Sequence, residues 1–287
     1  MDVAVIGAGR VGTALAVRLF DAGHRIVAIS GRAGTADRAA RYLPGVPIRP
    51  APSAARGAEV VIIGTPDDLI EATASSLAGE GAVGQGQTLI HLSGATSLSA
   101  LSAPRAAGAE VLSVHLLQTF PDVDAALSRM PGSGIAVTAM SEAGYVLGER
   151  LARDIGGRSF RLADEAKPLY HAAAVFASNY LVAITALADE LFHDAGIPEP
   201  TEFFLPLQRA TLDNVAAMGP AAALTGPAIR GDAGTVAANL EALAKHAPEA
   251  VPAYVALADV ALDLAHRSGR LSTAVRAAVE GVLDSWR

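Results

Sequence analysis

The chain of 287 residues contains no cysteine. This absence excludes a disulfide-stabilised scaffold, a thiolate nucleophile and a cysteine-ligated zinc site. Positive charge is also scarce, because 22 Lys and Arg residues stand against 29 Asp and Glu residues and no basic run occurs. A net charge of −7 repels phosphate backbones, so we expect no nucleic-acid partner.

Long apolar runs and a basic leader are missing as well. Asp2 occupies the place where a signal peptide would have Lys or Arg, and the apolar run after it is short. The most apolar long segment, 171–192, is rich in alanine and is interrupted by polar side chains. A membrane span needs about 20 predominantly apolar residues, so this segment is interpreted as a buried core helix. We expect a cytoplasmic protein without a membrane partner.

The residues that are present favour a globular chain, because 51% of them are hydrophobic and 18% are charged. Short runs rich in Val and Ile, bounded by Gly, Pro or Ser, recur through the first half, and segments of helical period such as 11–21 and 69–77 lie between several of them. Uninterrupted apolar runs predict strands buried on both faces, and strands alternating with helices predict a mostly parallel sheet. The seven runs are 3–6, 26–29, 60–63, 88–92, 111–114, 135–138 and 159–162.

The pattern changes near residue 163. Beyond it no run of strand character appears, and prolines separate helical stretches rich in Ala and Leu. We therefore predict a sheet-rich domain over residues 1–164 and a helical domain over residues 165–287.

A glycine motif follows the first predicted strand and opens the first predicted helix. In this context Gly7 permits a tight turn, Gly9 leaves room for a pyrophosphate and Gly12 lets helix and strand approach closely. The free N–H groups of the helix then favour phosphate. The motif predicts a doubly wound Rossmann sheet. Together with the helical stretches after residue 163, it predicts an α/β fold followed by an all-α C-terminal domain. The alternative interpretation of the motif is a glycine-rich turn that binds nothing. The expected loop contacts to the cofactor come from Gly7, Ala8, Gly9, Arg10, Val11 and Gly12.

The end of the second strand selects the cofactor. An NAD enzyme typically has Asp or Glu there, whereas this chain has Ser30 and then Arg32. A hydroxyl and a guanidinium suit a 2′-phosphate, so we predict NADP (as NADPH) rather than NAD. Thr65 and Pro66 follow the third strand, at the edge where ligands bind in such sheets, and are also expected to contact the cofactor.

Polar side chains follow the next two strands. Ser93, His115 and Gln118 are predicted to bind the carboxylate or carbonyl of a small-molecule substrate, because they follow strands at the carboxyl edge of the sheet. His91 lies within its strand and is interpreted as a core histidine with satisfied hydrogen bonds. No metal-ligand spacing is apparent, so no metal site is predicted.

A helix is expected to begin near Lys167, with Pro168 in its first turn. At 100° per residue, Lys167 and His171 lie on one face together with Ser178 and Thr185, and Asn179 flanks it. Reduction of a carbonyl creates an alkoxide that needs a proton donor, and Lys167 or His171 is the predicted catalytic donor.

A loop between later helices contains the sequence LTGPAIRGD over 224–232. Arg230 is predicted to clamp a substrate carboxylate, with Thr225 and Asn179 as further substrate contacts. Asp232 is interpreted either as part of this cluster or as the N-cap of the next helix.

These motifs together resemble one bacterial family: GAGRVG, GTPDD, HLSGA, VHLLQTFP, the helix with K-x-x-x-H and ASNY, and LTGPAIRGD with TVAANLEAL. The family comprises Rossmann-like oxidoreductases with a helical C-terminal domain of unknown function. It belongs to the 6-phosphogluconate-dehydrogenase-like superfamily, near the ketopantoate reductases, the pyrroline-carboxylate reductases and the deazaflavin-dependent NADP oxidoreductases. The resemblance implies NADP, a homodimer packed through the helical domain and a site between domains. Lys167 matches the acid/base Lys of related β-hydroxyacid dehydrogenases. His171 stands where those enzymes have Asn, and Leu117 stands where Pro is expected.

The leading hypothesis is an NADPH-dependent reductase of a small oxo acid, for which ketopantoate is the analogy. One alternative keeps the cofactor and reduces a cyclic imine such as a pyrroline carboxylate, which arrives protonated and needs less acid help. Another is a non-catalytic NADP(H)-binding regulator.

Overall fold

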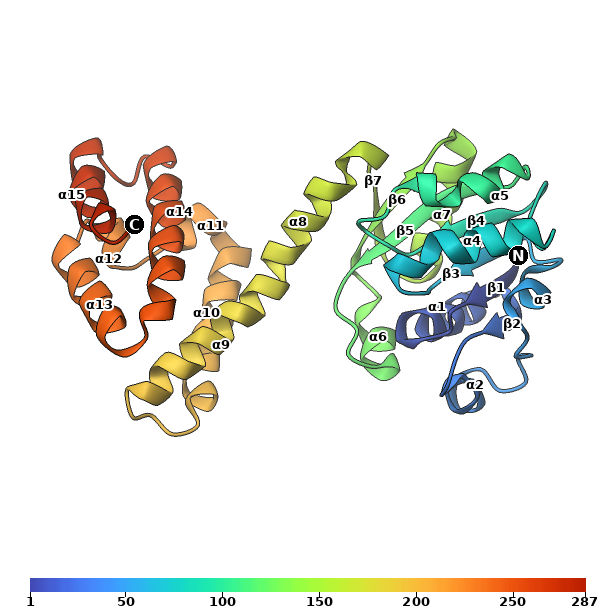
Figure 1. The fold of residues 1–287 in the computed structure, drawn as a ribbon, viewed down its shortest axis with the longest axis horizontal. Coiled ribbons are helices and arrows are strands. Elements are labelled where there is room, and N and C mark those ends of the chain that lie inside the picture. Colours follow the sequence, from blue (N-terminus) through green and yellow to red (C-terminus); the bar gives the residue numbers. More distant parts are fainter. The chain divides into compact units, whose positions relative to one another are not determined.

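The computed structural model describes residues 1–287 and contains one sheet of seven strands in the order β2-β1-β3-β4-β5-β6-β7. Every predicted strand is present, and all neighbours pair in parallel except β5 and β6. The predicted mostly parallel α/β sheet is confirmed (Figure 1). The strands are β1 (Asp2–Ile6), β2 (Arg25–Ser30), β3 (Val60–Ile63), β4 (Thr88–His91), β5 (Glu110–Leu117), β6 (Gly134–Ala139) and β7 (Arg158–Arg161).

Both faces of the sheet are buried, which explains the uninterrupted apolar runs. Val3 and Val5 of β1 belong to one core, whereas Ala4 and Ile6 of the same strand belong to the other. The first core is completed by α1 (Arg10–Asp21), α2 (Thr35–Tyr42), α6 (Val123–Arg129) and α7 (Glu142–Asp154). The second core is completed by α3 (Ala51–Ala55), α4 (Ile70–Gly79) and the turn η2 (Leu98–Leu101), which leads into α5 (Ser102–Ala106).

The strand order reverses direction between β1 and β3, because the chain first builds β2 on one side of β1 and then continues on the other. Ligands of open α/β sheets bind at this kind of position, outside the carboxyl ends of the strands. The loops after β1, β3, β4 and β5 therefore frame the candidate site.

The far edge of the sheet is formed by β7. All four of its residues are exposed, and arginines stand at both ends of the strand. Arg161 forms ion pairs with Glu142 and Glu149 of α7.

The chain divides into two compact units, residues 1–177 and 178–287. The division falls after α8 (Lys167–Ala177) rather than at the predicted 164/165 boundary. The expected helix start at Lys167 is confirmed, and no strand follows β7.

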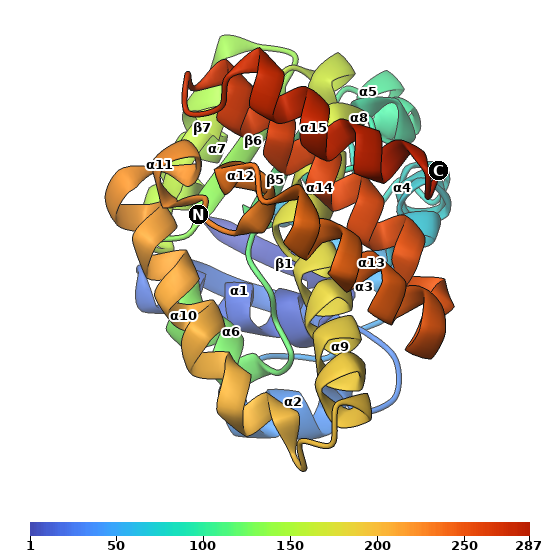
Figure 2. The same ribbon diagram turned by 90° about the vertical axis from the view of Figure 1, so that its left-hand side faces the viewer.

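The second unit is helical throughout, as predicted. Its core lies where α13, α14 and α15 pack side by side, around buried residues such as Val236, Leu262 and Val279 (Figure 2). The helices are α9 (Asn179–Asp194), α10 (Pro200–Met218), α11 (Pro220–Ala223), α12 (Pro227–Arg230), α13 (Ala233–His246), α14 (Val251–Arg267) and α15 (Thr273–Asp284).

The expected core helix over 171–192 is wrong in two respects. Ser178 leaves the helical conformation, with φ −129° and ψ −65°, so α8 and α9 are separate helices and Thr185 does not continue the face of Lys167. The stretch Asp164–Asp194 is long and apolar enough to cross a membrane by length and composition, and none of its most apolar window is buried within the chain. Several of its apolar side chains are exposed, among them Leu169 and Val182.

Candidate functional site

The glycine loop joins β1 to α1 in a conformation that only glycine accommodates. Gly7 has φ +88°, and a Cβ there would lie 2.7 Å from the carbonyl carbon of Gly64, in the loop after β3. A Cβ on Gly12 would lie 2.6 Å from the carbonyl oxygen of Gly7. The glycines at 7 and 12 therefore allow two loops and one helix to touch, as predicted.

Gly9 differs from its two neighbours in the motif. A Cβ at this position would meet no atom closer than 4.0 Å, so packing within the chain does not require glycine there. No side chain caps α1, which leaves the N–H groups of its first turn free for an anion. The open space at Gly9 and the uncapped helix fit a pyrophosphate.

A cavity of about 410 Å³ extends from the glycine loop to the end of β2. It contains the predicted residues Ser30, Arg32, Thr65 and Pro66, and no acidic residue lines it. It also contains Arg38 of α2, which the sequence analysis missed. Arg38 donates to the carbonyl oxygen of Ala8 at 3.1 Å and to Thr35 Oγ1 at 3.3 Å. Two guanidinium groups and the hydroxyl of Ser30 form a wall suited to a phosphate.

A second cavity of about 220 Å³ adjoins the first, because Gly64 and Thr65 line both. The hydroxyl of Thr65 is buried and has no hydrogen-bond partner. An unpartnered buried hydroxyl is energetically unfavourable unless a ligand or water bonds it. The second cavity is lined by Val11, Gly64, Thr65, Asp67, Leu92, His115, Leu116, Gln118 and Phe120.

Ser93 is buried beside this cavity and is fully engaged. Its hydroxyl donates to Asp67 Oδ2 at 2.5 Å and accepts the N–H groups of Ala95 and Thr96 at 3.1 and 2.9 Å. Asp67 therefore binds Ser93 and does not cap the helix that follows β3. The predicted contact of Ser93 with substrate stays a prediction.

Lys167 is the largest fully buried side chain, with a relative exposure of 1%. Its Nζ donates to the carbonyl oxygen of Ser93 at 3.1 Å and to Ser113 Oγ at 2.6 Å, which connects α8 to the loop after β4 and to β5. Burial lowers the pKa of Lys167 to about 8, against the influence of Asp164 and Asp67. Lys167 lines neither cavity, and its catalytic role stays a prediction.

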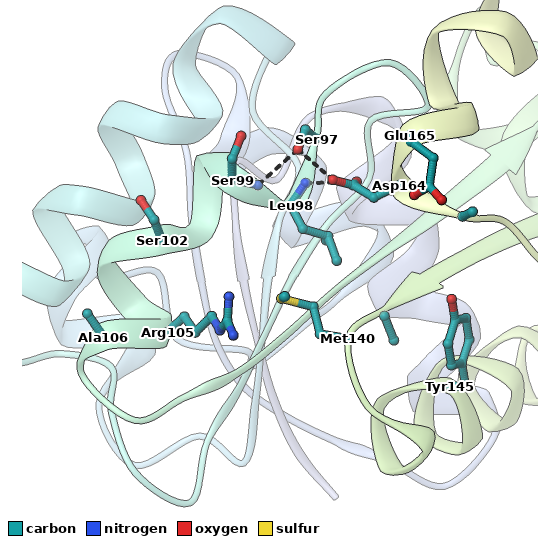
Figure 3. A pocket seen from close by; sticks show the side chains of 12 residues that line it. Ser97, Leu98, Ser99, Ser102, Arg105, Ala106, Met140, Tyr145, Asp164 and Glu165 are labelled. Atoms are coloured by element: carbon teal, nitrogen blue, oxygen red, sulfur yellow. Dashed lines mark hydrogen bonds between the residues drawn. The ribbon is translucent and has the colours of Figure 1, made fainter.

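The turn that precedes α8 is fixed by Asp164. Its carboxylate accepts hydrogen bonds from Ser97 Oγ at 2.6 Å and from the N–H of Leu98 at 3.0 Å. Figure 3 shows this contact in the wall of a third cavity of about 820 Å³, where Arg105 and Met140 lie opposite the turn. The contact positions the first residue of α8.

His115 lies within β5, because this strand continues two residues beyond it. Its Nδ1 is 2.7 Å from the hydroxyl of Tyr170, and the two rings meet edge to face. Burial, followed by the charge of Lys167, lowers the pKa of His115 to about 4. Burial raises the pKa of Tyr170 to about 12. Tyr170 was not among the predicted site residues, since nothing in its local sequence distinguishes it from a packing aromatic.

Two histidines that interact electrostatically with His115 contain buried nitrogens without partners. His171 Nδ1 is one, and His91 Nε2 is the other, although His91 Nδ1 accepts the N–H of Ser93 at 3.2 Å. His91 lies in the sheet as predicted, but its hydrogen bonds are not all satisfied. Burial lowers its pKa to about 3.

Three predicted substrate contacts belong to the second unit. Asn179 begins α9, Thr225 precedes α12 and Arg230 ends α12; all three are exposed. Their contact with substrate stays a prediction. Asp232 accepts the N–H of Thr235 at 3.0 Å, which confirms its interpretation as an N-cap.

The sheet has the fold of the NAD(P)-dependent oxidoreductases and is followed by a helical C-terminal part. The glycine loop and the two adjoining cavities lie at the point where its strand order reverses, after β1 and β3. Residues 1–116 match the family model of a Rossmann-like domain, and residues 133–261 match that of a domain of unknown function, DUF2520. The chain thus joins a Rossmann-like domain to a DUF2520 domain, as the resemblance implied.

Solved structures with this fold have low sequence identity. TM1727 from Thermotoga maritima has a TM-score of 0.72 and 24% identity over 93% of this chain and 99% of its own. BF3122 from Bacteroides fragilis has a TM-score of 0.70 and 23% identity over 91% and 97%. A reductive aminase from Aspergillus terreus, in complex with NADPH and ethyl levulinate, has a TM-score of 0.61 and 19% identity over 99% and 92%. No curated protein matches the chain.

Proposed function

We propose that the protein is an NADPH-dependent reductase of a small oxo acid. One observation supports this most directly. The cavity of the glycine loop and the arginines continues, through Gly64 and Thr65, into a second cavity that contains His115 and Gln118. A reduced nicotinamide dinucleotide supplies hydride when it is bound. The chain supplies the pocket that orients the acceptor and the groups that hold or move a proton.

The residues of the first cavity fit such a dinucleotide. Gly9 and the uncapped start of α1 would hold the pyrophosphate. Ser30, Arg32 and Arg38 would hold a 2′-phosphate, and the absence of an acidic residue from this wall favours NADPH over NADH. The A. terreus aminase of the same fold binds NADPH, which agrees with this choice.

The second cavity would hold the carbonyl of the substrate beside His115 and Gln118. No Lys or Arg lines this cavity, so the substrate carboxylate needs a cation from elsewhere in the protein. Arg230 is our proposed source, because a guanidinium binds a carboxylate with two parallel hydrogen bonds. An Arg230→Lys variant should raise KM for the oxo acid and leave the Kd for NADPH unchanged.

A second candidate function is the reduction of a cyclic imine. The Asp67 carboxylate in the wall of the second cavity favours this alternative, since it would attract a protonated imine and repel a carboxylate.

Two measurements test the function and separate the alternatives. Calorimetry with NADPH, NADP⁺ and NADH should show binding of the phosphorylated dinucleotides, and failure of all three to bind would refute the proposal. NADPH oxidation is then followed with a panel of 2-oxo acids that includes ketopantoate, and with 1-pyrroline-5-carboxylate. Turnover of imines alone selects the second candidate. Tight binding without any turnover selects the non-catalytic regulator.

We also propose that a second copy of the chain covers the exposed apolar helices. Val182 of α9 and Phe203 and Leu207 of α10 are 68%, 70% and 66% exposed. The exposed apolar surface continues onto α10, beyond the stretch Asp164–Asp194 that could span a membrane, and Ser178, Asn179 and Thr185 interrupt that stretch. A homodimer is therefore the better cover. Light scattering should give twice the chain mass, and Leu207→Glu should give a monomer; a monomeric wild type would refute this.

A further inference from the structure

The pairing of His115 with Tyr170 assigns a direction to proton movement at the candidate site. We infer that the Tyr170 hydroxyl donates to His115 Nδ1, holds the imidazole with its proton on Nε2, and thereby makes His115 the group that protonates the reduced product. This inference rests on the proposed reductase function. It makes Tyr170 a positioning residue and moves the proton source from Lys167 to His115.

The hydrogen-bond partners fix the direction of this bond. The hydroxyl of Tyr170 has no other partner in the chain, so Nδ1 is the one acceptor that the chain offers to its O–H. An Nδ1 that accepts leaves the single proton of a neutral imidazole on Nε2. Nε2 makes no hydrogen bond within the chain and is not among its buried unpartnered atoms. The Nε2–H of His115 is therefore available to a ligand in the second cavity, which His115 lines.

The surroundings keep both partners in these protonation states at neutral pH. Burial and the nearby Lys167 and His171 disfavour the imidazolium of His115, whereas Asp67 favours it more weakly. His91 of β4 is the other titratable group coupled to this ring, and burial holds it neutral as well. With a pKa near 4 for His115 and near 12 for Tyr170, the pair is a neutral imidazole and a neutral phenol.

Packing holds the ring in place. A Cβ at Gly94, in the loop after β4, would lie 2.8 Å from His115 Cε1, so glycine at this position makes room for the imidazole. Tyr170 also contacts Phe160 of β7, with the two ring centroids 6.0 Å apart. The loop after β4 and the edge strand β7 thus both contribute to the alignment.

Lys167 is less suitable as the donor. Its Nζ is already bonded to the carbonyl oxygen of Ser93 and to Ser113 Oγ, and it lines neither cavity. Its charge instead helps to keep His115 neutral.

The step balances without a further reactant. A bound reduced nicotinamide dinucleotide would supply hydride to the carbonyl carbon, and the C=O π electrons would pass to oxygen. That oxygen takes the Nε2 proton of His115, while Nδ1 takes the proton of the Tyr170 hydroxyl. The imidazole stays neutral throughout. After product leaves, water protonates Nε2 and Nδ1 returns its proton to the phenolate, which restores the starting tautomer. Without Tyr170 the same transfer would leave an imidazolate, which is far less favourable.

The tautomer can be measured without any substrate. Long-range ¹H–¹⁵N spectra of the ¹⁵N-histidine-labelled full chain distinguish protonated from unprotonated ring nitrogens, and a His115→Gln sample assigns the signal among the seven histidines. We expect protonated Nε2 and unprotonated Nδ1 at pH 7, and a mixture of tautomers in Tyr170→Phe. A wild-type Nδ1–H tautomer, or an unchanged spectrum in Tyr170→Phe, would overturn the inference.

Kinetics with ketopantoate and NADPH test the proton transfer. Tyr170→Phe should lower kcat by about 100-fold at pH 7, with KM within about twofold, because general acid catalysis contributes 10²–10⁴-fold. The matched control is Tyr42→Phe, whose hydroxyl bonds Asp124 at an exposed position and should leave kcat unchanged.

The pH profile separates proton supply from a structural role. Between pH 5 and pH 9 the wild-type kcat should be flat. In Tyr170→Phe only the imidazolium of His115 can donate, so kcat should rise as the pH falls from 7 to 5. A Tyr170→Phe variant that equals wild type in kcat, or is slower with a flat profile, would refute the relay. Absence of wild-type turnover with both ketopantoate and 1-pyrroline-5-carboxylate would refute the proposed function. The tautomer measurement uses no substrate, so it tests the hydrogen bond between Tyr170 and His115 separately from that function.

Discussion

Burial of the Lys167 ammonium predicts how the free energy of unfolding changes with pH, and this prediction depends on neither cofactor nor substrate. Burial lowers the pKa of this side chain from 10.5 to about 8. The shift of roughly 2.5 pKa units corresponds to about 3 kcal/mol, at 1.36 kcal/mol per unit. Between pH 8 and pH 10.5 the unfolded chain retains the lysine proton that the folded chain has lost. The free energy of unfolding should therefore rise with pH through this window.

The matched variant is Lys167→Met, which keeps an unbranched side chain and removes the charge. At pH 7 wild type is destabilised by the buried charge and the variant is not. The stability of the variant relative to wild type should therefore be higher at pH 7 than at high pH. The difference between the two proteins should shrink by about 3 kcal/mol between pH 7 and pH 10.5. Urea unfolding followed by circular dichroism measures this difference in the free energy of unfolding. If the two units unfold in separate transitions, the transition that NADP⁺ shifts is the one to compare.

A direct titration complements the unfolding experiment. Lys167 and Lys245 are the only lysines in the sequence, so lysine labelled with ¹³C at Cε gives two resonances. Lys245 lies exposed on α13 and serves as the internal control, identified by a Lys245→Arg variant. The Lys167 signal should have its inflection near pH 8. An inflection at the ordinary lysine value, or a stability difference that does not change with pH, would refute the reasoning.

Three further outcomes follow from the same structure. Gly9→Ala should change the free energy of unfolding by no more than about 1 kcal/mol, since its Cβ meets open space. It should weaken NADPH binding at least tenfold, as measured by calorimetry. Unchanged affinity would show that the pyrophosphate does not bind at this loop. Arg32→Ser should weaken NADPH binding by about tenfold or more and leave NADH binding unchanged, and an equal loss for both would contradict a 2′-phosphate contact. Burial lowers the pKa of His91 to about 3, so its contribution to stability is fully present above pH 6.5 and is lost as the pH falls below it. Urea unfolding of wild type should lose about 3 kcal/mol more than His91→Asn between pH 7 and pH 4, and parallel losses would contradict this.

The elements that depend on local pattern were predictable from the sequence. The seven strands follow from Val- and Ile-rich runs, because burial on both faces of a parallel sheet leaves an uninterrupted apolar signature. The glycine loop follows from the requirement for a positive φ and for close backbone approach. Both kinds of signal are contained within a few consecutive residues.

The missed features all depend on contacts between distant segments. Tyr170 meets His115 across 55 residues, and Arg38 reaches the glycine loop across 30. The pairing of β5 with β6 carries the strand past His115, although the apolar run ends before it. The interruption at Ser178 is marked by neither Pro nor Gly, so helical periodicity alone continued through it. Tertiary contacts outweighed local propensity at each of these places.

The exposed strand β7 has a consequence for how copies of this chain can meet. An open sheet border offers unpaired N–H and C=O groups to any extended segment, and continuous addition of strands leads to fibres. Guanidinium groups stand at both tips of this strand, and one is already engaged by two carboxylates of α7. Two copies that paired through their β7 edges would bring these arginines together and would have to break the ion pairs of Arg161. Growth of the sheet from one molecule to the next is thereby discouraged, which agrees with the proposed homodimer through the helices.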